Sequence, residues 1–102
     1  MEPPGHFVFA KIMDTIGPMV RGEKYAQPLD RDLEAQGLGT VTGGGTQMAK
    51  QGGIERVGID IDLTDLARGI EFTRRRLHEL GAPHGSVLEY RIGEQRLSVE
   101  IT

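Results

Sequence analysis

The acidic residues Asp60, Asp62 and Asp65 form the first group in this sequence whose spacing could support chemistry, because clustered carboxylates can bind a divalent cation. Thr64 and Glu71 follow at intervals that resemble those of a calcium-binding loop. That loop needs glycine at its sixth position, where this chain has Asp65. On a strand, Asp60 and Asp62 also stand about 7 Å apart. We therefore predict no metal site and interpret these acids as solvent-facing, with a weak magnesium site or an acidic docking patch as alternatives.

A glycine-rich stretch over residues 37–48 is the second candidate, because successive backbone amides in a glycine loop can surround an anion. Its spacing matches neither the P-loop nor the dinucleotide pattern, which would need glycine in place of Thr42. A strand is expected to follow, so no helix dipole would assist. We interpret Gly37 as a helix cap and the run Gly43–Gly45 as a bulged or flexible edge strand. The alternative is close approach of a ligand, or strand addition by another chain.

Three successive arginines, residues 74–76, are the third candidate, here for phosphate or nucleic-acid binding. On a helix, successive side chains point about 100° apart, so the three cannot form one patch. Arg75 can instead pair with Glu71 and Glu79 at spacings of four. We interpret this region as a solvated helix face with local ion pairs.

The three histidines, His6, His78 and His84, are the remaining candidates for chemistry. No Ser, Asp or Glu stands in a recognisable catalytic relation to them, and the nucleophile-elbow pattern is absent. We therefore predict no catalytic residue and favour a protein that is not an enzyme. A small enzyme using His84 or His6 with a carboxylate stays as an alternative.

Size and composition restrict the possible functions. The chain has 102 residues, a net charge of −3 and no cysteine. We predict a single domain over residues 1–102, with residues 1–5 as a flexible arm, and neither disulfides nor thiolate metal sites. Mild acidity argues against a nucleic-acid partner, which would favour a basic surface. Because no apolar run is long enough to span a membrane and no secretory signal is recognisable, we expect a cytoplasmic protein without a membrane partner.

The apolar pattern changes from period two to a helical period at Thr64, which indicates a strand followed by a helix. The remaining elements follow from similar patterns and from Gly and Pro breaks. We predict strands at 6–13, 40–48, 54–63, 86–92 and 95–101, and a helix from residue 25 or 28 to 36 after a polar connection at 19–24. A second helix is capped by Thr64 and closed by Gly81, and Gly93-Glu94 joins the last two strands.

This order, βαββαβ with the last strand extended as a hairpin, predicts a ferredoxin-like α+β sandwich. The first strand has apolar residues on both faces, so we place it in the middle of the sheet. Two helices cover one face of an antiparallel sheet in this fold. The other face is left open to a partner.

Three segments carry a resemblance to known proteins. The segments at residues 36–47, 58–66 and 80–86, within a region covering about residues 25–92, resemble small bacterial proteins of uncharacterised function with a ferredoxin-like fold. Some of those are similar to immunity proteins encoded beside polymorphic or contact-dependent toxins. The resemblance implies a cytosolic protein that neutralises a toxin by occupying its active face. Such families share no single binding surface, so the resemblance assigns no site residue.

The sequence as a whole predicts a non-enzymatic protein-binding module, in the form of a bacterial toxin-neutralising immunity protein that blocks its partner's active surface. The partner would be another protein, such as a basic toxin domain, and no cofactor is expected; a homodimer is left open. Alternatives are a dimeric small-molecule sensor and the small enzyme described above. The candidate contact residues are Asp60, Asp62, Gly43, Gly44, Gly45, Asp30, Asp32 and Glu34.

Overall fold

A five-stranded antiparallel sheet is the frame of the structure, a computed structural model that describes residues 5–101. Its strands are β1 (His6–Ile12), β2 (Gly39–Met48), β3 (Ile54–Leu63), β4 (Val87–Ile92) and β5 (Gln95–Glu100). They are ordered β2-β3-β1-β4-β5, and each neighbouring pair is antiparallel. The predicted α+β class is confirmed. Apart from Gly5, the predicted N-terminal arm lies outside the described residues.

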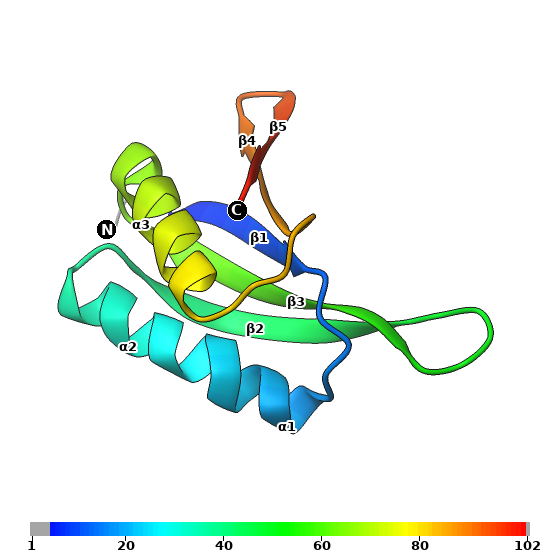
Figure 1. The fold of residues 1–102 in the computed structure, drawn as a ribbon. Helices are drawn as coiled ribbons and strands as arrows, with labels where there is room; N and C mark the ends of the chain where they lie inside the picture. Colours follow the sequence, from blue (N-terminus) through cyan, green and yellow to red (C-terminus); the bar gives the residue numbers. More distant parts are fainter. Residues whose placement is uncertain (1–4, 102) are drawn as a thin grey trace.

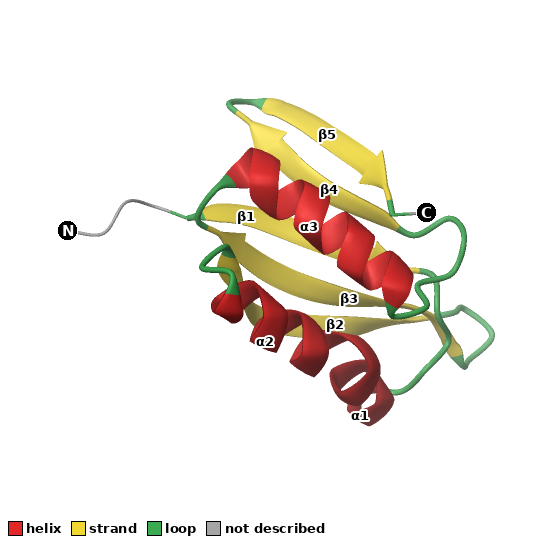
Figure 2. Cartoon of the chain, turned by 60° about the vertical axis from the view of Figure 1, so that its left-hand side comes forward, coloured by secondary structure: helices red, strands yellow, loops and turns green. Residues whose placement is uncertain are grey.

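The helices all lie on one face of this sheet, as Figures 1 and 2 show. They are α1 (Pro18–Arg21), α2 (Gln27–Ala35) and α3 (Leu66–Glu79), with the π-helical turn η1 (Gly22–Ala26) between the first two. The core lies between these helices and the sheet, and includes Tyr25, Leu33 and Leu77, all fully buried. Among residues 5–101, no helix is long and apolar enough to cross a membrane.

Strand alternation explains which side chains enter this core. In β1, Val8, Ala10 and Ile12 are fully buried, while Phe7 and Phe9 project from the opposite face. In β3, the odd-numbered residues from 57 to 63 are buried in the same way. The predicted middle position of the first strand is confirmed, since β1 pairs with both β3 and β4.

The predicted polar connection at residues 19–24 is wrong, because the chain there is helical. Pro18 begins α1 as its first residue, where its missing N–H costs nothing. In η1 the backbone N–H of Gln27 donates to the carbonyl of Gly22, five residues earlier, as in a π turn. The helical path continues into α2 and buries Tyr25. Exposure of Met19 and Val20 breaks the apolar period that would have revealed this helix.

The helix ends confirm some predictions and correct one. Gly37 and Gly81 have φ values of +66° and +100°, as expected of residues that close helices. The predicted cap at Thr64 is wrong: Asp65 is the N-cap, and its carboxylate accepts from the backbone N–H of Arg68 at 3.1 Å. Thr64 Oγ1 instead donates to the carbonyl of Gly37 at 2.9 Å, which ties β3 to the end of α2.

The glycine triplet lies within one continuous strand. β2 continues through it, and the register passes from Val41 opposite Ile61 to Gly43 opposite Asp60. The predicted edge position of this strand is confirmed, but the irregularity is at the skipped residue Thr42, directly before the triplet in which the bulge was expected.

Candidate functional site

The face of the sheet opposite the helices has no covering element among the described residues (Figure 2). Alternation and strand register place side chains of four strands on it. We call this surface the open face and define it by Phe7, Phe9, Lys11, Gly58, Asp60, Asp62, Glu89, Arg91, Arg96 and Ser98. Two of the predicted contact residues, Asp60 and Asp62, lie on this face together with several residues that the sequence did not single out.

The aromatic side chains of β1 are the apolar part of the open face. Phe9 lies over Gly58 of β3, where an added Cβ would overlap the Phe9 ring. Gly58 is therefore buried although its position faces away from the core. Phe7 has no such cover, and 59% of its surface is exposed.

Two carboxylates lie directly beside these rings. Asp62 is opposite Phe7 and Asp60 is opposite Phe9 in the β1–β3 register. Glycine makes room for both acids: an added Cβ on Gly5 would overlap the Asp62 carboxylate, and one on Gly43 would lie 3.2 Å from Asp60 Oδ2. Within residues 5–101, neither carboxylate has a hydrogen bond or an ion pair. The predicted acidic patch thus forms one side of an aromatic surface.

Two arginines lie on the other side of β1. Arg91 and Arg96 are directly opposite each other in the β4–β5 hairpin, and both are exposed. Like charges in this position destabilise a strand pair, and neither arginine has an ion pair in the described part of the chain. Lys11 and Glu89, between the two sides, form an ion pair of 3.6 Å. A hollow of about 670 Å³ lies between the start of β1 and this hairpin.

Sequence reasoning missed the phenylalanines and the arginines as site residues. Apolar residues on both faces of the first strand predict its central position, and this pattern does not single out Phe7 or Phe9. Arg91 and Arg96 stand symmetrically about the Gly93-Glu94 turn. This spacing was the available signal, because a tight hairpin pairs positions at equal distances from its turn.

The predicted acids of the first helix lie in the helical layer and are not brought together with Asp60 and Asp62. Asp30 accepts from Thr40 Oγ1 at 2.9 Å and from the Val41 backbone N–H at 2.8 Å, which ties α2 to β2. Asp32 pairs with an arginine of α3, and Glu34 is exposed. Their contact with a partner stays a prediction, as does that of Gly43, Gly44 and Gly45 at the sheet edge.

The arginine run of α3 forms ion pairs, but not those expected. Arg74 pairs with Glu71 at 3.0 Å, and Arg76 pairs with Asp32 and with Glu79. Arg75, for which Glu71 and Glu79 were predicted, lies over the ring of Phe72 at 5.8 Å from its centroid. Ion pairs at a spacing of three residues, and the pair between Arg76 and Asp32 of α2, form instead of the expected pairs at a spacing of four.

The histidines do not converge on a catalytic arrangement. His6 borders the hollow, His78 lies near the end of α3, and His84 lies in the following loop. Over residues 5–101, their side chains have no hydrogen bond and no ion pair with a carboxylate. No group of three or more His, Asp or Glu side chains in that range is placed to hold a metal ion.

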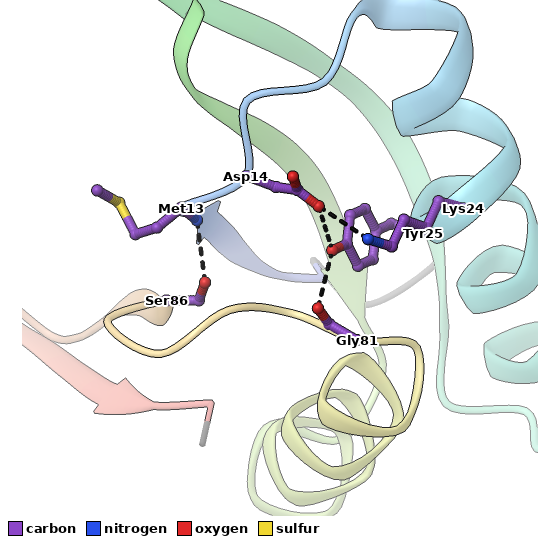
Figure 3. A network of polar contacts seen from close by, with 6 residues as sticks. All are labelled: Met13, Asp14, Lys24, Tyr25, Gly81 and Ser86. Atoms are coloured by element: carbon purple, nitrogen blue, oxygen red, sulfur yellow. Dashed lines mark hydrogen bonds and ion pairs between the residues drawn. The ribbon is translucent and has the colours of Figure 1, made fainter.

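A polar network under the helices has a structural role (Figure 3). The hydroxyl of buried Tyr25 lies 2.7 Å from Asp14 Oδ2 and 3.2 Å from the Gly81 carbonyl, and Lys24 Nζ lies 3.0 Å from the same carboxylate. Burial alone would raise the pKa of Asp14, but these hydrogen bonds outweigh it and lower that pKa. Burial and the Asp14 hydrogen bond raise the pKa of Tyr25. The network therefore joins the loop after β1, η1 and the end of α3 through an ionised carboxylate.

Comparisons with known proteins assign no function to this arrangement. No protein-family model matches the sequence, and neither a curated protein nor a solved structure is significantly similar to it. The likeness to immunity proteins therefore stays a prediction. The open face, with exposed Phe7 and the carboxylates of Asp60 and Asp62, is therefore the candidate contact surface.

Proposed function

We propose that this protein is a non-enzymatic protein-binding module whose contact surface is the open face of its sheet. The observation that carries the proposal is Phe7, an aromatic side chain on the middle strand with 59% of its surface exposed. Covering such a ring removes apolar surface from water, which is favourable by about 25 cal/mol per Å². Aromatic residues are also enriched at protein interfaces.

The fold that we propose for this module is the ferredoxin-like sandwich with an added strand. The order β2-β3-β1-β4 with antiparallel neighbours supports it, since helical segments follow β1 and β3. β5 then extends the sheet beyond β4 as the second strand of a hairpin. In this arrangement the helices protect one face and leave the other for a partner.

The carboxylates beside Phe7 and Phe9 favour a partner with basic groups. Asp60 and Asp62 have no internal partner in the described residues, and opposite charge on an approaching protein would speed encounter. A toxin domain with a basic active surface, as the sequence resemblance implies, is the form of this function that we propose. The mechanism is steric and electrostatic blocking of that surface.

Capture from the native host with the tagged wild-type protein and two variants tests this proposal. Phe7→Ser removes the exposed ring from the open face, whereas Met19→Ser removes a side chain, 77% exposed, from α1 in the helical layer. We expect stoichiometric partners, identified by mass spectrometry, to be lost with Phe7→Ser and retained with Met19→Ser. Equal capture by all three proteins would show that the open face is not the contact surface.

Small-molecule binding is a second candidate function, favoured by the hollow beside Phe7. Its volume of about 670 Å³ lies within the usual range for ligand pockets. Arg91 and Arg96 would favour a carboxylate or phosphate ligand, since arginine binds these anions through two parallel hydrogen bonds. A ligand screen by thermal unfolding tests this, because binding to the folded state raises the melting temperature. An increase that survives Arg91→Ala and Arg96→Ala together would count against this site.

A further inference from the structure

We infer that the outer edge of β2 binds an extended, basic segment of the partner protein as an additional strand of the sheet. The inference rests on the proposed function, because the segment belongs to the same partner that contacts the open face. Its basis is the row of backbone groups that β2, as an end strand, directs away from the sheet, together with the carboxylate of Asp60 beside it.

The pairing of β2 with β3 shows which of its backbone groups point outward. The Asp60 carbonyl points towards β2, where Thr42 Oγ1 donates to it at 3.4 Å. In an antiparallel pair, hydrogen-bonded and non-hydrogen-bonded positions alternate. Gly43, opposite Asp60, is therefore hydrogen-bonded to β3. Gly44 and Thr46, at the alternate positions that follow, direct their N–H and C=O groups away from the sheet.

The protein itself satisfies one outward amide of this edge. The Val41 N–H donates to Asp30 Oδ1 of α2 at 2.8 Å, so the start of the edge is closed. Beyond Val41, the outward backbone groups of Gly44 and Thr46 have no such partner within residues 5–101. The part of the edge that is open to another strand therefore lies in the glycine triplet and directly after it.

The two end strands of the sheet, visible in Figure 2, differ in their protection against pairing. β5 has six residues and carries Arg96 and Glu100, and short length and charge both discourage pairing with another chain. β2 has ten residues with neither a charged side chain nor a proline. Its bulge at Thr42 precedes the open part, where the pairing with β3 stays regular from Gly43 to Gln47. The added strand therefore belongs on β2.

Asp60 determines the chemistry of the added strand. Its carboxylate extends towards β2, since a Cβ on Gly43 would lie 3.2 Å from Oδ2, and nothing lies within 4 Å of a Cβ on Gly45. A lysine or arginine of the added strand can therefore reach over the glycine backbone to this carboxylate, which has no ion pair within residues 5–101. A second copy of β2 has no basic side chain to offer, so the complementary occupant is a segment of another protein.

Amide hydrogen exchange of the full chain with a synthetic peptide, followed by NMR, tests the inference. The probe alternates valine and lysine, which favours an extended strand with the lysines on one face, and its control has glutamate in place of lysine. We expect saturating lysine peptide to slow exchange at Gly44 and Thr46 by about tenfold or more. The glutamate peptide should leave both amides unchanged. Gly45, whose amide is bonded to β3 with or without peptide, is the internal reference.

Thr46→Pro and Thr46→Val are the matched variants for this experiment. Both lose the hydroxyl that accepts from Arg21 at 3.2 Å, but only the proline also removes the outward N–H. Proline is tolerated where the N–H of an edge strand faces solvent, and circular dichroism verifies that both variants are folded. We expect Thr46→Pro to lose the lysine peptide and Thr46→Val to retain it. Asp60→Asn should weaken binding and reduce its dependence on salt.

Unchanged exchange at Gly44 in the presence of the lysine peptide would overturn the inference. So would equal effects of the two peptides, or binding that survives Thr46→Pro. Slow exchange at Gly44 in concentrated protein without peptide would assign the edge to a second copy, which also overturns it. Capture from the host decides the proposed function separately: partners lost with Phe7→Ser but retained with Thr46→Pro would keep that function and reject the added strand.

Discussion

The ring of Phe9 lies over Gly58 of the neighbouring strand, and its Cζ and Cε1 atoms occupy the space that a Cβ on Gly58 would need. The two residues are diagonal across β1 and β3, since Gly58 is opposite Lys11. The contact covers the backbone of Gly58, which is buried although its position is on the open face. It also leads to the first prediction.

Gly58→Ala should destabilise the protein by about 1–3 kcal/mol, because the added methyl group forces the Phe9 ring off its position. Urea denaturation measures the loss. Gly45→Ala is the matched control: Gly45 is opposite Gly58 in β2, and an added Cβ there meets nothing within 4 Å. Adding Phe9→Ala to Gly58→Ala should recover much of the loss due to the clash. A Gly58 variant as stable as the Gly45 variant would contradict the contact.

Thr73→Val should leave stability unchanged or raise it by up to about 1 kcal/mol. Thr73 in α3 is fully buried, and its Oγ1 has no hydrogen-bond partner in the described structure. Replacing an unsatisfied buried hydroxyl by a methyl group of similar size removes its desolvation cost. Thr73→Ser, which keeps the hydroxyl and loses the methyl group, should be less stable than wild type. Thermal unfolding of both variants decides the point, and a marked loss in Thr73→Val would reveal a hydrogen bond of this hydroxyl.

Asp65→Ala should cost about 0.5–2 kcal/mol, the usual value of a helix N-cap. Its carboxylate accepts from the Arg68 backbone N–H, so Asp65→Asn should retain most of the stability. Guanidinium denaturation of the pair gives the difference. If the alanine and asparagine variants were equally stable, the side chain would not act as the cap.

Asp14→Asn should destabilise the protein at neutral pH, by about 1–3 kcal/mol for a hydrogen-bonded charged group. The pKa of Asp14 is lowered from its ordinary value of 3.8. Its ionised form therefore contributes stability above pH 3.8, and this contribution disappears as the pH falls through the lower pKa of the folded state. The two proteins should thus converge in stability below pH 3.8. Chemical denaturation at several pH values measures the gap, and a constant gap would show that the ionised carboxylate is not what stabilises this network.

Lys24→Met is the companion variant for that network. Its ammonium pairs with Asp14 at 3.0 Å, but 40% of the side chain is exposed. Exposed pairs contribute little to stability, so we expect Lys24→Met to cost less than Asp14→Asn at neutral pH. A larger loss for Lys24→Met would place the main interaction on the lysine instead of the Tyr25 hydroxyl.

Local pattern alone determined several elements of this protein. The period-two run before Thr64 predicted a strand at 54–63, the bounds that β3 has. Gly37 and Gly81 marked helix ends because only the backbone conformation at those positions matters, and glycine adopts it without strain. The α+β class followed from the order of such elements.

Tertiary contacts decided what local pattern could not. The helix from Pro18 carries exposed Met19 and Val20. Its π turn accompanies burial of Tyr25, whose hydroxyl contacts Asp14 and the Gly81 carbonyl, 11 and 56 residues away in the sequence. The open face likewise depends on strand register, which places Phe9 over Gly58 and Arg91 opposite Arg96. Periodicity reports which way a side chain points, whereas a site is made by neighbours from different strands. Those neighbours become adjacent only when the sheet is assembled.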